Sequence, residues 1–295
     1  MLKRTFFFSS PVMLNLCDNQ LVLHLKEAPE EKRTFPVEDI GVVVLEHPMI
    51  HITLPRLNAL SENNVAVVIC DRKQMPSSML LCLDSGSVQG ELFRYQTEAG
   101  EALKKNLWKQ IIEVKIENQA RLLDKTSCGG DVLKPVYKSV KSGDSTNREA
   151  VAAKIYWELL FGPGFVRCRE GQPPNNLLNY GYTILRAATA RALMGSGLLP
   201  ALGIFHRNRY NAFPLADDVM EGYRPYVDEC VYDLYFSGHR DLTKEVKTAL
   251  LGVLFADTVF RKVTRPLEIG LTITTASLAK CFAGKQKKLS YPSIT

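Results

Sequence analysis

A helix with a carboxylate on its apolar face begins within the stretch Gly143-Asp144-Ser145-Thr146-Asn147-Arg148-Glu149-Ala150. At about 3.6 residues per turn, the apolar residues from Val151 to Leu160 cover one broad arc of this helix. Glu149 falls in the middle of that arc, where the helix should meet the rest of the protein. A buried carboxylate is costly unless a cation or hydrogen-bond donors meet it. Glu149 therefore needs a partner.

Two partners for Glu149 remain open on this stretch alone. Thr146-x-x-Glu149 has the spacing of a capping box, in which an N-cap threonine and a glutamate three residues later satisfy each other's backbone N–H groups. A divalent metal ion is the other possibility. The local sequence favours the capping box, and the rest of the chain reverses that order.

The composition is that of an ordinary globular protein. The chain has 295 residues, enough for two domains, of which 46% are hydrophobic and 23% charged. A net charge of +6 permits a polyanionic partner without requiring one. Seven scattered cysteines without a Cys-x-x-Cys pair indicate a reduced, cytoplasmic protein with neither a disulfide framework nor a zinc site. No apolar run is long enough to span a membrane, and Phe6–Phe8 is too short for a signal peptide.

Residues 1 to 83 are predicted to form a small β-rich domain, because short strand-like segments alternate there with turn residues. The segments richest in β-branched residues, Asp39–Leu45 and Val65–Cys70, suit buried strands. A short helix is expected over Leu54–Asn63. The other expected strands are Thr5–Phe8, Val12–Cys17, Gln20–Lys26, Lys32–Phe35 and Met79–Leu83.

After a linker at residues 84–91 the pattern becomes helical, which predicts a larger all-α domain over residues 92–295 and an α+β fold class. Pro214–Tyr235 should form one or two helices, bent or broken near Pro225. The last residues, Lys285–Thr295, are polar and expected to fray. The other expected helices are Glu98–Lys125, Glu149–Leu160, Leu177–Gly195 with Asn175 or Asn176 as its cap, Lys244–Phe260 and Gly270–Phe282.

A second group of candidate residues surrounds His206. Two arginines follow this histidine closely, and their charge should keep the imidazole neutral, the form that binds metals. Asp217, Asp218 and Glu221 follow within five residues, more acids than a helix N-terminus needs, and the last two share a helix face. Oxygen ligands with one imidazole favour Mg²⁺ or Mn²⁺ over zinc. A satisfied loop histidine beside acids that stabilise a helix explains the same residues.

Five segments occur in order along the chain: Thr146–Ala150, Leu159–Gly162, Leu178–Tyr182, Gly203–His206 and Phe213–Pro225. Together they resemble the CRISPR-associated adaptation integrases of the Cas1 family. Lys115–Gln119 and the β-rich N-terminal half resemble the type II branch of that family in particular. The resemblance covers nearly the whole chain.

The resemblance implies a metal-dependent DNA integrase of CRISPR spacer acquisition, with a dimerisation domain at the N-terminus and a catalytic domain after it. The implied metal ligands are Glu149, His206 and Glu221, with Asp218 as a nearby acid that binds the metal directly or through water. Other branches have aspartate where this chain has Glu221.

The reaction that this resemblance implies joins the 3′-hydroxyl ends of captured double-stranded DNA to the CRISPR repeat by transesterification. The implied partners are that DNA, a second copy of the chain in a homodimer, and a small second adaptation protein that completes a larger integration complex. The implied cofactor is Mg²⁺ or Mn²⁺.

Basic residues near these segments are candidates for contacts to DNA phosphates, although a solvated surface explains each equally well. Two other functions remain open: a stand-alone metal-dependent DNA endonuclease with water as the nucleophile, and a non-catalytic DNA-binding scaffold. The scaffold has no use for Glu149 on an apolar helix face. The basic candidates are Arg186, Arg191, Arg207, Arg209, Arg224, Arg261 and Lys262.

Overall fold

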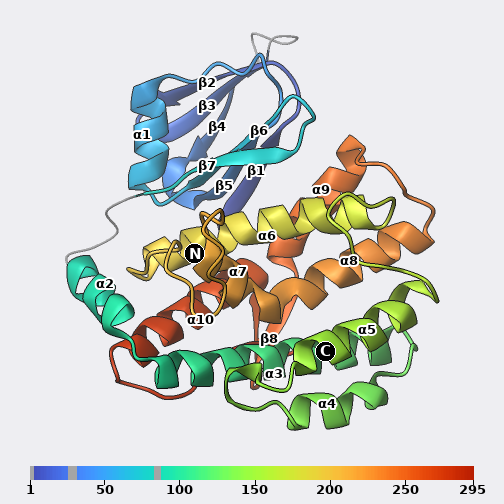
Figure 1. Ribbon diagram of the computed structural model, residues 1–295. Coiled ribbons are helices and arrows are strands. Elements are labelled where there is room, and N and C mark those ends of the chain that lie inside the picture. The colour runs from blue at the N-terminus through green and yellow to red at the C-terminus, as the bar shows by residue number, and fades with distance from the viewer. Residues whose placement is uncertain (1–2, 26–31, 83–87) are drawn as a thin grey trace. The chain divides into compact units, whose positions relative to one another are not determined.

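The computed structural model describes residues 3–25, 32–82 and 88–295. The chain divides into two compact units, Met1–Ser85 and Gly86–Thr295 (Figure 1). This boundary falls within the stretch 84–91, although helix α2 (Gln89–Glu98) already begins inside that stretch. The ends of two predicted strands, at Lys26 and Leu83, lie outside the described residues.

The N-terminal unit contains a four-stranded sheet in the order β1-β5-β6-β7. The first three strands in this order run parallel, and β7 pairs antiparallel with β6. Every residue of β5 is buried, as the valine-rich run predicts for a central strand. The strands are β1 (Arg4–Phe8), β5 (Ile40–Leu45), β6 (Ala66–Cys70) and β7 (Pro76–Leu80).

A second, antiparallel sheet has the order β2-β3-β4 and shares one apolar core with the first. Leu14 and Leu21 from this sheet belong to the same buried cluster as Val43 of β5 and Leu60 of the unit's helix. These sheets confirm the predicted β-rich N-terminal region. The remaining elements are β2 (Val12–Cys17), β3 (Gln20–Leu25), β4 (Lys32–Pro36), η1 (Val37–Asp39) and α1 (Leu54–Glu62).

The last strand of this unit lies earlier than the predicted Met79–Leu83, because a tight turn brings the chain back sooner. One carboxylate oxygen of Asp71 accepts the backbone N–H groups of Lys73 at 2.8 Å and Met75 at 3.0 Å. The strand that follows can therefore pair with β6 from Pro76 onward.

The larger unit is built around helix α6 (Asn175–Gly195), which packs against α7, α8, α9 and α10 and is buried on most of its surface (Figure 1). Within the described part of the chain, no helix combines the length and the apolar character needed to cross a membrane. The other helical elements are α3 (Glu101–Lys125), η2 (Gly130–Leu133), α4 (Lys134–Lys138), η3 (Ser142–Asp144), α5 (Arg148–Phe161), α7 (Pro214–Met220), η4 (Glu221–Tyr223), α8 (Arg224–Phe236), α9 (Lys244–Gly252), η5 (Val253–Phe255) and α10 (Leu267–Phe282).

Two predicted helices are interrupted. The helix predicted over Glu98–Lys125 is divided at Ala99 and Gly100, and Gly100 takes the extended conformation of an N-cap. The helix predicted over Lys244–Phe260 ends early, and its last residues form strand β8 (Asp257–Phe260), which pairs with β9 (Val263–Pro266). Threonine and valine in both strands favour this hairpin, so the unit is not purely helical as predicted.

The predicted cap of α6 is wrong, whereas the predicted break near Pro225 is confirmed. Neither Asn175 nor Asn176 caps α6: the helix begins at Asn175, whose side chain instead donates to the Val166 carbonyl and accepts from the Cys168 N–H. The break predicted near Pro225 is confirmed, because Pro225 lies in the first turn of α8, where it has no hydrogen bond to lose.

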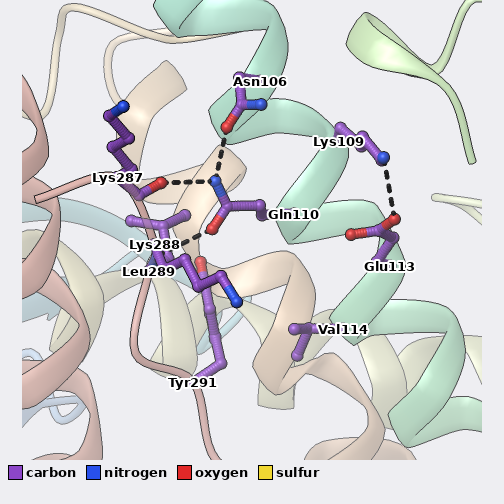
Figure 2. A pocket seen from close by; sticks show the side chains of 9 residues that line it. All are labelled: Asn106, Lys109, Gln110, Glu113, Val114, Lys287, Lys288, Leu289 and Tyr291. Atoms are coloured by element: carbon purple, nitrogen blue, oxygen red, sulfur yellow. Dashed lines mark hydrogen bonds and ion pairs between the residues drawn. The ribbon is translucent and has the colours of Figure 1, made fainter.

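The C-terminal segment is ordered, and the prediction that it frays is wrong. It runs along α3, where the side chain of Gln110 donates to the Lys287 carbonyl at 3.0 Å and accepts from the Leu289 N–H at 2.8 Å. Figure 2 shows these contacts beside a pocket of about 410 Å³. Further along, Asn118 donates to the Pro292 carbonyl and accepts from the Ile294 N–H, each at 3.2 Å. These amides replace the backbone partners that an extended segment lacks.

The side chain of Asn118 also donates to the Gly222 carbonyl at 2.9 Å, so one buried amide joins α3, η4 and the C-terminal segment. We expect Asn118→Ala to lower the free energy of unfolding by about 2 to 4 kcal/mol, because it leaves several buried backbone groups without partners. Urea unfolding of the metal-free protein measures this loss. Asn106→Ala, an exposed amide change on the same helix, should stay within about 0.5 kcal/mol of the unchanged protein. Equal losses for the two variants would contradict this role of Asn118.

Candidate functional site

The start of α5 is held by the carboxylate of Asp144. Its two oxygens accept the backbone N–H groups of Arg148 at 2.8 Å and Glu149 at 3.0 Å. The N-cap residue is Asn147, in the left-handed conformation with φ of 50°, and not Thr146. Of the two partners left open for Glu149, the capping box is thereby excluded: Asp144 supplies the acceptors, and the side chain of Glu149 contacts Lys115 instead.

Lys115 of α3 lies between two of the sequence-predicted site residues. Its Nζ is 2.6 Å from Oε1 of Glu149 and 2.6 Å from Oε2 of Glu221. Burial opposes the charge of this lysine, but attraction by Glu221 and Glu149 outweighs burial and raises the pKa of Lys115. The two carboxylates, from α5 and η4, thus converge on one buried cation.

Glu221 has a second cationic neighbour. Its Oε1 lies 2.9 Å from Nε of Arg224, one helical turn further on. Burial favours the neutral acid, but Arg224 and Lys115 together lower the pKa of Glu221 below its ordinary value. The guanidinium of Arg224 also lies over the ring of Tyr182, 4.5 Å from its centre. Glu221 is therefore an ionised carboxylate enclosed by two positive groups.

His206 is oriented by Asp218. Oδ1 of this fully buried aspartate lies 2.6 Å from Nδ1 of His206, and Oδ2 accepts the N–H groups of Ile204 at 2.6 Å and Phe205 at 3.0 Å. The neighbouring residue Phe205 stacks on Trp108 of α3, with ring centres 4.2 Å apart. With Nδ1 held in this way, Nε2 is the ring nitrogen left to bind a ligand.

The expectation that nearby arginines keep His206 neutral is wrong. Arg207 turns to Glu101, with N–O distances of 2.7 and 2.8 Å, and Arg209 lies over the ring of Tyr210. The hydrogen bond with Asp218 raises the pKa of His206, although burial opposes the charged form. Metals bind the neutral imidazole, and the raised pKa of His206 disfavours that form.

These side chains have the chemistry of a divalent cation site, but not its closed geometry. Among the described residues, no three His, Cys, Asp or Glu side chains form a ready ligand cluster. The point on which Glu149 and Glu221 converge is held by the ammonium of Lys115. The carboxylates of Glu149 and Glu221 and the imidazole of His206, which Asp218 orients, are ligands of the kind that Mg²⁺ and Mn²⁺ prefer.

A polar pocket of about 530 Å³ adjoins this centre, and His206 is among its lining residues. Arg167, Arg169, Arg186 and Arg224 line it as well. The first two are not among the basic residues predicted from the sequence, because they lie in a loop without helical or strand periodicity. The side chain of Arg167 is fixed by Asn175 and Asn179, at 3.0 and 2.7 Å. The pocket can accept a polyanion next to Glu149 and Glu221.

The remaining predicted basic residues have different surroundings. Arg186 makes a paired contact with Asp217, with N–O distances of 2.6 and 2.8 Å. Asp217 is therefore paired with an arginine and does not join Glu149 and Glu221. Arg191 is buried in α6 and is not offered to DNA in this structure. Arg261 and Lys262 are exposed in the turn between β8 and β9, where Arg261 lines a different pocket.

The interaction between His206 and Asp218 predicts a titration that can be measured. In the metal-free protein the pKa of His206 should lie above its ordinary value of 6.5, and Asp218→Asn should lower it because the amide carries no charge. Since the folded-state pKa is the higher one, this pair stabilises the fold fully below about pH 6.5, and the stabilisation is lost as the pH rises through the folded-state pKa. NMR signals of the ring nitrogens, recorded against pH with a chelator present, measure both values. The same pKa in both proteins would contradict the assignment.

Comparison with known proteins gives a consistent result. A family model described as CRISPR associated protein Cas1 matches residues 6–268. The CRISPR-associated endonuclease Cas1 of Neisseria meningitidis serogroup C is 41% identical over 230 residues, which cover 76% of this chain and 75% of that protein.

Two solved structures share the fold. A casposase bound to an integration product superposes with a TM-score of 0.78 at 20% identity, over 98% of this chain and 93% of that one. A Cas6-RT-Cas1–Cas2 complex gives a TM-score of 0.75 at 19% identity, over 99% of this chain and 36% of that longer one. At such low identity these two matches show the fold alone, and they confirm the predicted α+β fold class.

Proposed function

The chain belongs to the Cas1 family of CRISPR-associated proteins, and we propose that it is a metal-dependent DNA integrase of CRISPR spacer acquisition. Membership of the family supports an endonuclease or integrase of CRISPR adaptation. The proposal of a metal-dependent integrase rests on the convergence of Glu149 and Glu221 on one buried cation. A DNA-binding scaffold does not need this arrangement, which is costly to bury.

We assign the divalent cation to Glu149, Glu221 and Nε2 of His206. These residues would hold Mg²⁺ or Mn²⁺, which would polarise a phosphodiester and stabilise negative charge on its oxygens. Asp218 acts through His206 and not as a ligand. Its carboxylate is already hydrogen-bonded to Nδ1 of His206 and to the backbone N–H groups of residues 204–206. The sequence left open whether Asp218 binds the metal directly, and these contacts support the indirect role.

The pocket arginines supply the binding surface for the substrate. Arg167, Arg169 and Arg224 present guanidinium groups that match phosphate oxygens, and His206 lines the same pocket. The 3′-hydroxyl of a captured DNA fragment attacks a phosphorus atom at the edge of the CRISPR repeat. A new phosphodiester joins the fragment to the 5′ end of the repeat, and the original bond from that phosphorus to its 3′ oxygen breaks. The strand that flanked the repeat at this bond leaves with a free 3′-hydroxyl, which takes up the proton that the attacking hydroxyl loses. The protein chiefly aligns the two ends, as such in-line transfer requires.

The partners follow from the family and remain part of the proposal. Double-stranded DNA is the substrate, the β-rich unit joins two copies into a homodimer, and a small second adaptation protein completes the integration complex. The matched structure named as a Cas1–Cas2 complex supports this last partner. A cytoplasmic location is consistent with the seven cysteines, none of which forms a disulfide and all of which lie in the described ranges.

Hydrolysis by the same centre is the second candidate function. It uses water in place of the 3′-hydroxyl, and the name endonuclease given to the 41% identical Neisseria protein favours it. The two reactions differ in their products. Integration yields a longer, covalently joined strand, and hydrolysis yields only shorter ones.

Glu149→Gln, His206→Ala and Glu221→Gln should each reduce strand joining by at least about 100-fold, because each removes one of three groups that act together on one ion. A labelled duplex with free 3′-hydroxyls is incubated with a repeat-containing duplex and Mn²⁺, and joined strands are separated on a denaturing gel. The double variant Glu149→Gln with His206→Ala should be little worse than either single one.

Glu113→Gln is the matched control, since Glu113 is a half-exposed glutamate of α3 paired only loosely with Lys109 at 3.5 Å. It should retain most of the joining activity. Shortened strands without joined ones would identify a hydrolytic enzyme. Joining that survives Glu149→Gln would contradict the assigned centre.

A further inference from the structure

Both carboxylate oxygens of Glu221 are engaged by cations. Oε1 lies 2.9 Å from Arg224 and Oε2 lies 2.6 Å from Lys115. A divalent cation on either oxygen would lie close to a second positive charge, and two cations in a buried site repel each other strongly. One of the two side chains must therefore move before Glu221 can serve as a metal ligand.

Arg224 is the more firmly held of the two. Its guanidinium lies over Tyr182, and the hydroxyl of Tyr182 donates to the buried carboxylate of Asp228. Asp228 also accepts the hydroxyl of Tyr156 at 2.8 Å, which fixes it from α5. A planar guanidinium stacked in this way has little freedom to turn.

Lys115 is held differently. Its ammonium ends a flexible four-carbon side chain, and its two ion pairs are both with carboxylates of the proposed metal site, Glu149 and Glu221. Without this ammonium, the metal-free protein would hold the partly buried Glu149 close to the buried Glu221, and Arg224 would compensate Glu221 alone. Lys115 thus neutralises Glu149 and Glu221 in the metal-free site, as the divalent cation would in the loaded site.

We propose that Lys115 competes with the divalent cation for Glu149 and Glu221. It neutralises both carboxylates in the metal-free protein and leaves at least one of them when the metal binds. The inference rests on the proposed metal site and adds to it a lysine that sets the metal affinity. Loading the site then costs the displacement of an ammonium ion, so the affinity for metal is held below what the ligands alone would give.

Lys115→Met tests this competition, because methionine keeps most of the apolar side chain and removes the charge. We expect the dissociation constant for Mn²⁺, measured by calorimetry on the full chain, to fall at least about tenfold. The metal-free variant should melt at a lower temperature than the unchanged protein, and saturating Mn²⁺ should raise its melting temperature by more. Lys109→Met removes a charge from the same helix outside the centre, and it should change the dissociation constant by less than about twofold.

The outcomes separate this inference from the metal site itself. Mn²⁺ binding by Lys115→Met that is equal to or weaker than that of the unchanged protein would overturn the competition. In that case, weaker binding by Glu149→Gln would still support the site. Binding of Mn²⁺ to neither Lys115→Met nor the unchanged protein would contradict the site and the competition together.

A second measurement needs no variant. Crystal structures of the unchanged protein with and without Mn²⁺ should show Lys115 Nζ in contact with both glutamates only in the metal-free form. In the loaded form, its distance to at least one of them should exceed about 4 Å, the limit of an ion pair. A lysine that bridges both carboxylates beside a bound metal would overturn the proposal even if Lys115→Met does not fold.

Discussion

The helical unit depends on how it compensates the negative charge that it encloses. Glu221 and Asp218 are buried, Glu149 is partly buried, and a bare carboxylate in such surroundings costs far more than a surface one. Asp218 is met by backbone N–H groups and an imidazole, and Glu221 by Arg224 and Lys115. Each of these contacts draws one element of the unit toward the others, so the requirement for compensation also determines how the elements pack.

The rest of the unit holds this charged centre in place from behind. Tyr291 of the C-terminal segment donates its hydroxyl to the Val219 carbonyl at 2.9 Å, and its ring leaves no room for a side chain at position 222, where an added Cβ would lie 2.8 Å away. Gly222 is therefore required by close packing, directly after Glu221 in η4. Asn118 then joins η4 to α3, the helix that carries Lys115. The C-terminal segment, α3 and η4 thus form one support beneath the carboxylates.

The sequence pointed to those candidate site residues whose signal is local. Glu149 stands out because it interrupts an apolar face with a known period, and Asp218 and Glu221 stand out because acids crowd one helix turn. Lys115 lies in a segment that carries the family resemblance, but its contacts could not be predicted, since its partners lie far along the chain and meet it only after folding. Asp144 was missed because a left-handed residue, Asn147, shifts the helix start away from the expected cap.

We propose that Glu149, His206 and Glu221 hold one divalent cation at the edge of the arginine-lined pocket. Anomalous diffraction from crystals of the full-length protein soaked in Mn²⁺ tests it most directly. We expect one Mn²⁺ peak in this unit, about 2.1 Å from oxygens of both glutamates and from Nε2 of His206. A peak bound by Asp218 or Asp217 in place of these ligands, or no peak at Glu149 and Glu221 under saturating Mn²⁺, would contradict this metal site.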